Sequence, residues 1–444
     1  MDHVPFVPGS SYVHATNSGR RLLDRRIFTD PALFEQEMER IFGRVWIYVA
    51  HESQVPYPHD FMTTWVGRVP VIISRDRDGG LNAFANVCPH RGALLCRTTR
   101  GHAKDYVCPF HGWTFDERGQ LIAPMKERGG GYPEGFDKRE LGLRRVLIES
   151  YRGFLFANLD PAAGPLVDYL ADGAPFIDLI ADQSPGGIEV LKGSSTYTYN
   201  ANWKMQIENG VDGYHVDSVH ANYVQMYKNR ARRQAGGDSL KVVAVGDFTR
   251  NRGGFYDLHN GHGVIWTDLT NPTDRPVYNA YGELVERVGR TRADWMVLRS
   301  RNLVLYPNVF LMDQMSTQIR VVRPLAVDKT EVTIFCFGPV NEAADDRAKR
   351  IRQYEDFFNA SGMATPDDLT EFNVSQTGCM AADVMRYSDM SRGAAHEIPG
   401  PDEDAQALGI NPSASGMAVA DEGIFVGQHR RWAELMGFSG DLWP

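Results

Sequence analysis

Apolar side chains recur at helical spacing in three stretches of this chain. Asp30 followed by Pro31 is typical of a helix start, because aspartate caps free backbone amides and proline is tolerated at the first helical position. From there to Phe42 the apolar positions keep to one face, which predicts an amphipathic helix over residues 31–42. The same period predicts further helices over residues 169–182 and 347–358.

Short segments rich in β-forming residues follow the first helix, separated by turn signals such as Asp78-Gly79-Gly80. They predict strands at residues 69–75, 81–87, 113–115 and 154–159. Later strand candidates are residues 194–199, 301–310, 318–322 and 331–337. Residues 236–276 are rich in glycine, histidine and aromatic residues, and we expect them to form loops over a pocket.

The order of these elements predicts an α+β protein with more than one domain. A chain of 444 residues exceeds what one hydrophobic core usually organises. We expect an N-terminal arm and helix over residues 1–44 and a small antiparallel β domain over residues 45–160. A larger domain over residues 161–444 should have helices around an antiparallel sheet.

Composition narrows the class of protein. Hydrophobic residues make up 43% and charged residues 23%, close to the average for soluble globular proteins. No apolar run approaches the ~20 residues of a membrane-spanning helix. The N-terminal residues lack the apolar core of a signal peptide, so we expect a cytoplasmic protein. The 5 cysteines, an odd number at uneven spacing, suit a reducing compartment better than a disulfide framework.

The charge balance argues against nucleic acid as a partner. The formal net charge is -9, whereas nucleic-acid-binding domains are usually basic. The one basic cluster, KNRARR at residues 228–233, is interpreted as a solvated helix face. Docking of an acidic partner or attraction of an anionic substrate is the alternative role for this cluster.

The sharpest chemical signal is a pair of loops that each carry one cysteine and one histidine. The first loop contains Cys88 and His90, and the second contains Cys108 and His111. A Rieske [2Fe-2S] centre needs two cysteines on one iron and two histidines on the other, and two such loops supply both pairs. A zinc site is the alternative, although zinc modules usually bring the cysteines as one close pair and the histidines as another.

A second cluster lies in NWKMQIENGVDGYHVDSVH, residues 202–220. His215 and His220 are about 140° apart on a regular helix, so they can face one metal only if the helix ends or bends between them. Gly213 allows such an ending. Glu208, Asp212 and His215 have the spacing of one helical face, from which Asp212 can hydrogen-bond the far ring nitrogen of His215 and fix its tautomer. Packing or capping roles for both histidines are the alternative.

Two histidines with one carboxylate and open positions form the metal face of non-haem Fe(II) oxygenases, so the site needs an acid from elsewhere. Asp367 and Asp368 are candidates. They follow Thr365 and Pro366, so they also fit a helix start with a threonine cap and acids against the helix dipole. The residue pattern alone leaves both interpretations open, and other carboxylates remain eligible.

Taken in order, the Cys/His loops, the stretch NWK...EN..DGYH....H and the segment SGMATPDDLTEF resemble the large (α) subunit of Rieske ring-hydroxylating dioxygenases, in particular the benzoate, toluate and anthranilate 1,2-dioxygenase group. The likeness extends over nearly the whole chain. The resemblance implies a bridging aspartate at Asp212. The metal ligands that it implies are Cys88, His90, Cys108 and His111 for the [2Fe-2S] cluster, and His215, His220 and Asp368 for a mononuclear Fe(II).

The same resemblance implies a fold and an assembly. The fold is an N-terminal Rieske β domain followed by a helix-grip-like catalytic domain with an antiparallel sheet. The assembly is an α3β3 hexamer with a separate small β subunit, in which the cluster of one α subunit serves the iron of its neighbour through Asp212. Electrons come from NADH through a separate reductase or through a ferredoxin.

The implied reaction is dihydroxylation of a benzoate-like aromatic carboxylate with dioxygen. Its product is a cis-1,2-dihydrodiol, or a catechol after loss of a substituent. In the benzoate and anthranilate relatives an aromatic residue follows the second histidine, whereas this chain has Ala221. If that position lines the pocket, salicylate- or anthranilate-type hydroxylation is the alternative. Several arginines, including Arg301 and Arg320, are candidates to meet the substrate carboxylate.

Two function classes outside the oxygenases also remain. A Rieske electron-transfer protein would use only the cluster, and a zinc-stapled binding protein would hold zinc at Cys88 and Cys108. Metal content separates these classes from an oxygenase.

Overall fold

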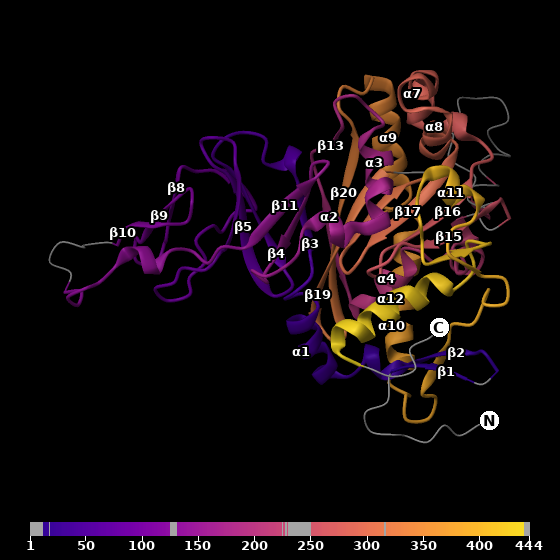
Figure 1. Cartoon of the computed structure of the whole chain (residues 1–444), viewed down its shortest axis with the longest axis horizontal. Coiled ribbons are helices and arrows are strands. Elements are labelled where there is room, and N and C mark those ends of the chain that lie inside the picture. Colours follow the sequence, from indigo (N-terminus) through magenta and orange to yellow (C-terminus); the bar gives the residue numbers. More distant parts are fainter. Residues whose placement is uncertain are drawn as a thin grey trace. The chain divides into compact units, whose positions relative to one another are not determined.

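The structure is a computed structural model of the chain. It describes residues 12–16, 18–124, 131–223, 225–226, 229, 250–314 and 317–438. Contacts divide the chain into two compact units (Figure 1). The smaller unit is residues 38–166, and the larger unit combines residues 1–37 with residues 167–444.

The described part of the smaller unit is built from antiparallel sheets with the strand orders β6-β5-β4-β7, β10-β9-β8 and β11-β12-β3. One buried cluster around Phe84, Trp113 and Phe115 lies between the first two of these sheets and also includes the side chains of Cys88 and Cys108. The strand bounds are β3 (Ile47–His51), β4 (Asp60–Val66), β5 (Val69–Arg75), β6 (Leu81–Ala85), β7 (Arg100–His102), β8 (Asp105–Val107), β9 (Thr114–Asp116), β10 (Leu121–Ala123), β11 (Leu147–Tyr151) and β12 (Phe154–Asn158). Two 3-10 turns are η2 (Glu52–Gln54) and η3 (Lys138–Leu141).

A ten-stranded antiparallel sheet organises the larger unit (Figure 1). Its order is β13-β20-β19-β18-β17-β16-β15-β23-β22, with β14 also paired to β20. The bounds are β13 (Ile188–Val190), β14 (Ser195–Tyr199), β15 (Gly253–Asp257), β16 (Gly263–Asp268), β17 (Arg299–Leu305), β18 (Val309–Asp313), β19 (Thr317–Ala326), β20 (Lys329–Pro339), β22 (Ile398–Pro399) and β23 (Ala414–Gly416). A small sheet joins β1 (Val13–Ala15), β2 (Arg21–Asp24) and β21 (Tyr387–Asp389).

Helices cover this sheet, as expected for the larger domain. α9 packs on β19 and β20, α8 on β17, α4 on β19, and α12 on β15, β16 and β23. The helix bounds are α1 (Pro31–Arg40), α2 (Leu166–Leu170), α3 (Ala174–Ala181), α4 (Trp203–Asn209), α5 (Val216–Val219), α7 (Tyr281–Val288), α8 (Arg290–Val297), α9 (Ala344–Asp356), α10 (Thr365–Cys379), α11 (Glu403–Leu408) and α12 (Gly423–Met436). The 3-10 turns are η1 (Arg25–Phe28), η4 (Ala171–Gly173), η6 (Pro272–Asp274) and η7 (Pro276–Ala280).

One buried carboxylate ties three distant parts of the larger unit together. Glu37 on α1 accepts hydrogen bonds from the Trp203 indole at 2.8 Å, from the Lys204 ammonium at 2.5 Å and from the Trp432 indole at 2.7 Å. Glu37 is fully buried and Lys204 is 3% exposed, so each charge depends on the other for compensation. The N-terminal arm, α4 and α12 therefore share one ionic contact.

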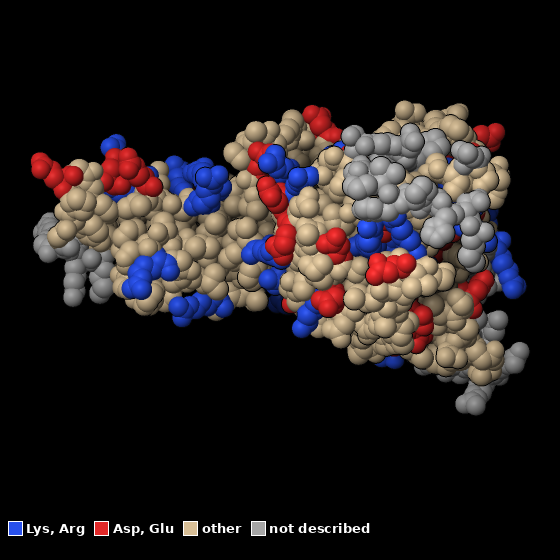
Figure 2. Space-filling model, turned by 90° about the horizontal axis from the view of Figure 1, so that it is seen from below, with Lys and Arg blue, Asp and Glu red and all other residues tan. Residues whose placement is uncertain are grey.

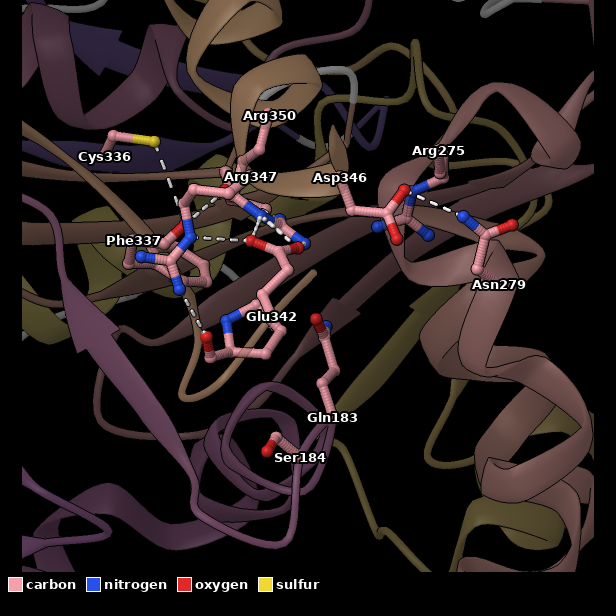
Figure 3. A network of polar contacts seen from close by, with 12 residues as sticks. Gln183, Ser184, Arg275, Asn279, Cys336, Phe337, Glu342, Asp346, Arg347 and Arg350 are labelled. Atoms are coloured by element: carbon pink, nitrogen blue, oxygen red, sulfur yellow. Dashed lines mark hydrogen bonds and ion pairs between the residues drawn. The ribbon is translucent and has the colours of Figure 1, made fainter. Parts of the chain in front are cut away.

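A second polar network fastens α9 to the end of β20 (Figure 3). Glu342 follows β20 and accepts from Arg350 at 2.5 Å and from Arg347 at 2.9 Å. The Arg350 guanidinium also donates to the Thr317 hydroxyl on β19 at 3.0 Å. Arg350 is buried, and its charge is matched by a carboxylate.

Three element predictions differ from the structure. Residues 301–310 belong to two strands, β17 and β18, because Pro307 cannot continue a ladder. The helix expected over residues 169–182 is interrupted by the turn at Ala171, which has φ 45°. The loops expected over residues 236–276 include β15 and β16, whose residues are almost all buried, so the usual alternation of apolar and polar positions is missing.

Acidic and basic side chains are interspersed on the face of the molecule that Figure 2 shows. That distribution accords with the absence of a basic stripe in the sequence. The basic cluster at residues 228–233 lies outside the described residues except for Asn229. No helix within the described ranges combines the length and the apolar character needed to cross a membrane.

Candidate metal centres

Two loops of the smaller unit share one backbone pattern. The Cys88 amide donates to the carbonyl five residues later at 2.8 Å, and the Gly92 amide donates back to the Cys88 carbonyl at 2.9 Å. The Cys108 amide makes the matching bond at 2.7 Å, and Gly112 donates back to Cys108 at 2.9 Å. Gly92 has φ 75° and Gly112 has φ 70°, a region that favours glycine. Each loop therefore holds its cysteine by the same turn.

The four side chains of these loops form a buried pair and an outward pair. Cys88 and Cys108 are 2% and 1% exposed, whereas His90 is exposed and His111 is half-buried. Burial raises the pKa of Cys88, and the neighbouring Cys108 thiol raises that pKa as well. The imidazole rings of His90 and His111 have centroids 4.6 Å apart. His90 also stacks on Trp113 with an interplanar angle of 8°, which fixes the ring.

This division fits a [2Fe-2S] cluster better than one zinc ion. Ligand atoms around a tetrahedral zinc lie roughly 3–4 Å from one another. Among the described residues, only one set of three or more such side chains has its ligand atoms within 4.8 Å of one another, and that set lies in the larger unit. The four loop side chains therefore do not converge on one point. A cluster with thiolates on one iron and imidazoles on the other matches a separated pair of each.

The stretch with the other two histidines is a helix, a break and one short turn of helix. α4 begins after Asn202, whose side chain accepts from the Lys204 amide at 3.1 Å. α5 lies between His215 and His220, which flank it at its two ends. The break includes Gly213, where a Cβ atom would lie 2.3 Å from the Val419 carbonyl oxygen. The condition that the helix ends between the two histidines is met, because α5 ends before His220.

The expectation that Glu208, Asp212 and His215 share one helical face is wrong, because α4 ends at Asn209. Asp212 nevertheless reaches His215, since its Oδ2 atom lies 3.0 Å from Nδ1 of the ring. Glu208 turns instead to His429 on α12, with 2.7 Å between Oε1 and Nε2. The predicted contact between Asp212 and His215 is therefore present. It forms because the helix ends after Asn209, and the two residues do not share a helical face.

Three ligand-type side chains converge at this point. The Nε2 atoms of His215 and His220 are 3.3 Å apart, and Oδ1 of Asp368 lies 3.5 Å from the first and 3.3 Å from the second. Ligand atoms about 2.1 Å from one divalent ion, at roughly tetrahedral or octahedral angles, would be separated by similar distances. Asn209 donates to Asp368 Oδ1 at 3.3 Å and supports it from α4. The donor set fits a single divalent metal.

The charges around this triad suit metal ligation. Burial lowers the pKa of His215, but the hydrogen bond and charge of Asp212 raise it overall, with help from Asp368. Burial raises the pKa of Asp368, yet the hydrogen bond and charge of His220, then the charges of His215 and Arg320, hold that pKa below its usual range. Asp368 therefore remains an anion despite being 4% exposed.

Asp367 and Asp368 occupy different environments at the start of α10. Asp368 joins the triad, whereas the Asp367 side chain is 38% exposed and its Oδ2 lies 3.9 Å from Nδ1 of His220. The threonine-cap interpretation is wrong. Ala364 is the residue before the helix, and the Thr365 hydroxyl donates to a backbone carbonyl at 3.0 Å. Both acids do lie in the first turn.

The triad forms part of the wall of a cavity with about 720 Å³ of empty space, a volume that includes space open to solvent. Phe357 and Phe358 supply aromatic surface. The sheet contributes side chains from one face of four successive strands, because alternate residues of a strand point the same way. These side chains are Ile265, Thr267, Ser300, Asn302, Met312, Gln314 and Arg320.

Several cavity residues escape sequence reasoning. Asn302 and Gln314 line the cavity and bond to each other at 2.8 Å, and Asn302 also donates to the Gly210 carbonyl at 3.0 Å. Neither has a distinctive sequence signal, because Asn302 follows the polar half of β17 and Gln314 directly follows Asp313 at the end of β18. Ala221 is exposed and is not among the described residues that line this cavity.

Family models match both halves of the chain. The model of the Rieske [2Fe-2S] domain matches residues 45–133. The model of the ring hydroxylating alpha subunit catalytic domain matches residues 190–407. The two matches lie in the order that the Cys/His loops and the histidine triad predict.

Curated relatives cover most of the chain. It is 48% identical over 422 residues to the toluate 1,2-dioxygenase subunit alpha of Pseudomonas putida, with 95% of this chain and 92% of the relative covered. It is 49% identical over 422 residues to the 2-halobenzoate 1,2-dioxygenase large subunit of Burkholderia cepacia, covering 94% and 90%. Identity to the anthranilate 1,2-dioxygenase large subunit of Acinetobacter baylyi is 46% over 429 residues, covering 95% and 90%.

Solved structures give the same picture of the fold. Naphthalene 1,2-dioxygenase from Rhodococcus sp., crystallised with indole, superposes with a TM-score of 0.81 at 25% sequence identity. That alignment covers 94% of this chain and 94% of the crystallised chain. The α+β architecture with an N-terminal Rieske domain and a C-terminal catalytic sheet is thereby confirmed.

Proposed function

Because this chain belongs to the family of ring-hydroxylating oxygenase α subunits, we propose that it is a terminal oxygenase component that dihydroxylates an aromatic carboxylate. The observation that carries the proposal is a His-His-carboxylate triad that lines one cavity together with the aromatic side chains of Phe357 and Phe358. Curated relatives whose names specify toluate, 2-halobenzoate and anthranilate support the substrate class.

The proposal gives each centre its residues. Cys88, His90, Cys108 and His111 would hold the Rieske cluster, and His215, His220 and Asp368 would hold mononuclear iron. An Fe(II) ion in such a facial triad supplies redox chemistry that activates dioxygen. The overall reaction adds both oxygen atoms of O2 to the ring and consumes two electrons and two protons, supplied by NADH and one H+.

The surrounding residues position the reactants. Phe357, Phe358 and Met312 offer apolar surface to the ring and keep water out of the cavity. Asp212 at Nδ1 of His215 fixes the tautomer whose Nε2 lone pair faces the triad. Asn209 holds Asp368 in place by a hydrogen bond. These residues set where the ring and dioxygen meet.

The proposal includes partners. A separate reductase, or a ferredoxin, would deliver electrons from NADH to the cluster, which would place the enzyme in the cytoplasm. A small β subunit would complete an α3β3 hexamer, and Asp212 would link the cluster of one α subunit to the triad of the next. The half-exposed carboxylate of Asp212, with 24% of its side chain accessible, is compatible with a contact across a subunit boundary.

Salicylate- or anthranilate-type hydroxylation by the same centres is the second candidate. The similarity to an anthranilate 1,2-dioxygenase large subunit supports it. Such a substrate carries an extra hydroxyl or amino group, and the product after loss of a substituent is a catechol. Both candidate reactions would use the same cluster ligands, namely the thiols and imidazoles of the two Cys/His loops.

The test is single turnover of the purified, reduced oxygenase with benzoate, anthranilate and salicylate under dioxygen. The expected product from benzoate is a cis-1,2-dihydrodiol that keeps the carboxylate, identified by mass spectrometry with 18O2 to count both oxygens. Absence of any oxygenated product from all three acids would exclude the proposed substrate class. A cluster that is reduced and reoxidised without product would favour the electron-transfer alternative.

A further inference from the structure

Arg320 is an unusual cation at the centre of the sheet. It lies on β19, is 1% exposed, and is the only arginine or lysine among the described residues that line the cavity. A buried guanidinium normally has a carboxylate partner, because an uncompensated buried charge is costly. Nε and Nη2 of Arg320 are buried without a hydrogen-bond partner among the described residues.

The other deeply buried arginines of the larger unit show what a structural partner looks like. Arg275 and Arg301 both contact the carboxylate of Asp313. Arg350 contacts Glu342 at 2.5 Å in the network of Figure 3. Arg301, the other sequence candidate for a substrate contact, is thus already paired. Arg320 differs from these three in facing the cavity without a carboxylate of its own.

From this contrast, and resting on the proposed function, we propose that Arg320 binds the carboxylate of the aromatic acid and is the residue that selects acids over neutral arenes. A guanidinium presents its N–H donors in a planar fork that matches a carboxylate in a two-bond contact. A substrate carboxylate would supply hydrogen-bond acceptors for Nε and Nη2 of Arg320, which have none among the described residues.

Other polar groups of the cavity are less suited to this role. Asn302 and Gln314 already bond to each other, and Asn302 also bonds to Gly210. Asp368 belongs to the triad, where its Oδ1 atom lies 3.3 Å from Nε2 of His220, and a carboxylate has no donor to offer an anion. Among the described lining residues, Arg320 is therefore the best placed to attract an anion.

Its place also suits the position of attack. In a 1,2-dioxygenation of an aromatic acid, carbon 1 carries the carboxylate, so the group that binds the acid must border the metal triad. Arg320 lines the same cavity as His215, His220 and Asp368, and its charge is one of those that lower the pKa of Asp368. Phe358 lies under the guanidinium, with Cζ 5.6 Å from the ring centroid, and limits its movement.

The test compares benzoate with benzamide, a neutral analogue of similar shape, by calorimetric binding to the purified oxygenase complex. The wild-type protein should bind benzoate on the order of 100-fold more tightly than benzamide, because only the anion compensates the buried guanidinium. Arg320→Met should weaken benzoate binding on the order of 100-fold and change benzamide binding less than about threefold. Arg320→Lys should fall between, since it keeps the charge and loses the fork.

Arg323→Met is the matched control, because Arg323 lies on the same strand, bonds to Glu331 at 3.1 Å and does not line the cavity. It should bind benzoate like the wild type. Unchanged benzoate affinity in folded Arg320→Met would overturn the role of Arg320. If that variant does not fold, the wild-type ratio decides: equal affinity for benzoate and benzamide would overturn it too.

Different results would contradict the proposed function and the proposed role of Arg320. A wild-type complex that neither binds nor oxidises any aromatic acid would remove the proposed function. A wild-type complex that oxidises benzoate, with an Arg320→Met variant that binds it equally well, would remove only the specificity role.

Discussion

The two candidate metal centres are assembled in opposite ways. The Cys88 and Cys108 loops lie close in sequence, each closed by the same backbone turn, and their histidines face outward. The triad joins the break after α4 to Asp368 on α10, which is far away in the sequence, and all three of its side chains line one cavity. A centre that exchanges electrons needs an accessible edge, whereas one that handles a reactive oxidant needs exclusion of water.

The two centres therefore depend on different kinds of contact. The loops depend on local hydrogen bonds and two glycines, so they should survive changes in the larger unit. The triad depends on the packing of α4, α5 and α10 around one cavity, so it should respond to changes far from its ligands. Variants that remove one centre and spare the other therefore test the comparison directly.

The largest expected effect comes from removing one thiolate of the proposed [2Fe-2S] cluster. Cys88→Ser should abolish the visible absorbance and the electron paramagnetic resonance signal of the reduced cluster, and turnover with them, because a [2Fe-2S] cluster needs both thiolates. Cys96→Ser is the control, since Cys96 is a neighbouring free cysteine outside the two turns. A coloured, active Cys88→Ser protein, or zinc in the wild type, would contradict the cluster assignment.

The second-largest expected effect comes from removing a ligand of the metal triad in the larger unit. Asp368→Ala should lower turnover by more than about 10³-fold and remove the mononuclear iron, while the cluster signal remains. Asp367→Ala should retain the iron and lose no more than about tenfold in turnover, because Asp367 is 3.9 Å from His220 and partly exposed. Metal analysis of both proteins checks this, and iron loss in Asp367→Ala alone would reverse the assignment.

A smaller effect sharpens the link between the centres. Asp212→Ala should lower turnover on the order of 100-fold and leave cluster absorbance and iron content nearly unchanged, because Asp212 orients His215 without being a ligand. Asp217→Ala, an exposed acid in α5, serves as the control and should stay within about twofold. Full turnover in Asp212→Ala would favour an electron-transfer protein without a working triad.

The smallest expected effect is on thermal stability, and it comes from the acidic residue Glu422 near the metal triad. Burial raises the pKa of Glu422 to about 7, and nearby carboxylates including Asp212 contribute. The folded state then prefers the protonated form, so the stabilisation is complete below pH about 4.5 and is lost as pH rises through about 7. Glu422→Gln, which stays neutral, should melt about 1–3 °C above wild type at pH 8 and equal it at pH 4.5. Calorimetry checks this, with exposed Glu403→Gln expected to show no such pH dependence.

Local patterns predicted the local centre well. The residue types and spacing of the two loops indicated the cluster, and the first helix was confirmed from its start at Pro31, where Asp30 accepts from the Ala32 amide at 2.8 Å. The strand at Val69–Arg75 also matches its prediction. These features depend on neighbours in the sequence, and alternation or capping records them directly.

Long-range features were less accessible. Nothing in the local pattern separates Asp367 from Asp368, because their difference arises from how α10 meets His220. Arg301 pairs with Asp313, whereas Nε and Nη2 of Arg320 have no hydrogen-bond partner within the described ranges, and both facts depend on strand neighbours and on a cavity wall. The buried strands β15 and β16 were predicted as loops, because both of their faces are covered by packing that the sequence does not display.

The contact at Glu37 has a consequence for dividing the protein into fragments. Because Glu37 compensates Lys204 and binds Trp432, the unit that carries the triad is discontinuous in the gene, with residues 38–166 inserted into it. A fragment that starts at residue 45 would leave Lys204 buried without the Glu37 carboxylate, in the first turn of α4, the helix that precedes His215. Isolating the catalytic unit therefore requires both ends of the chain, for example by co-expression of the first 37 residues as a separate peptide.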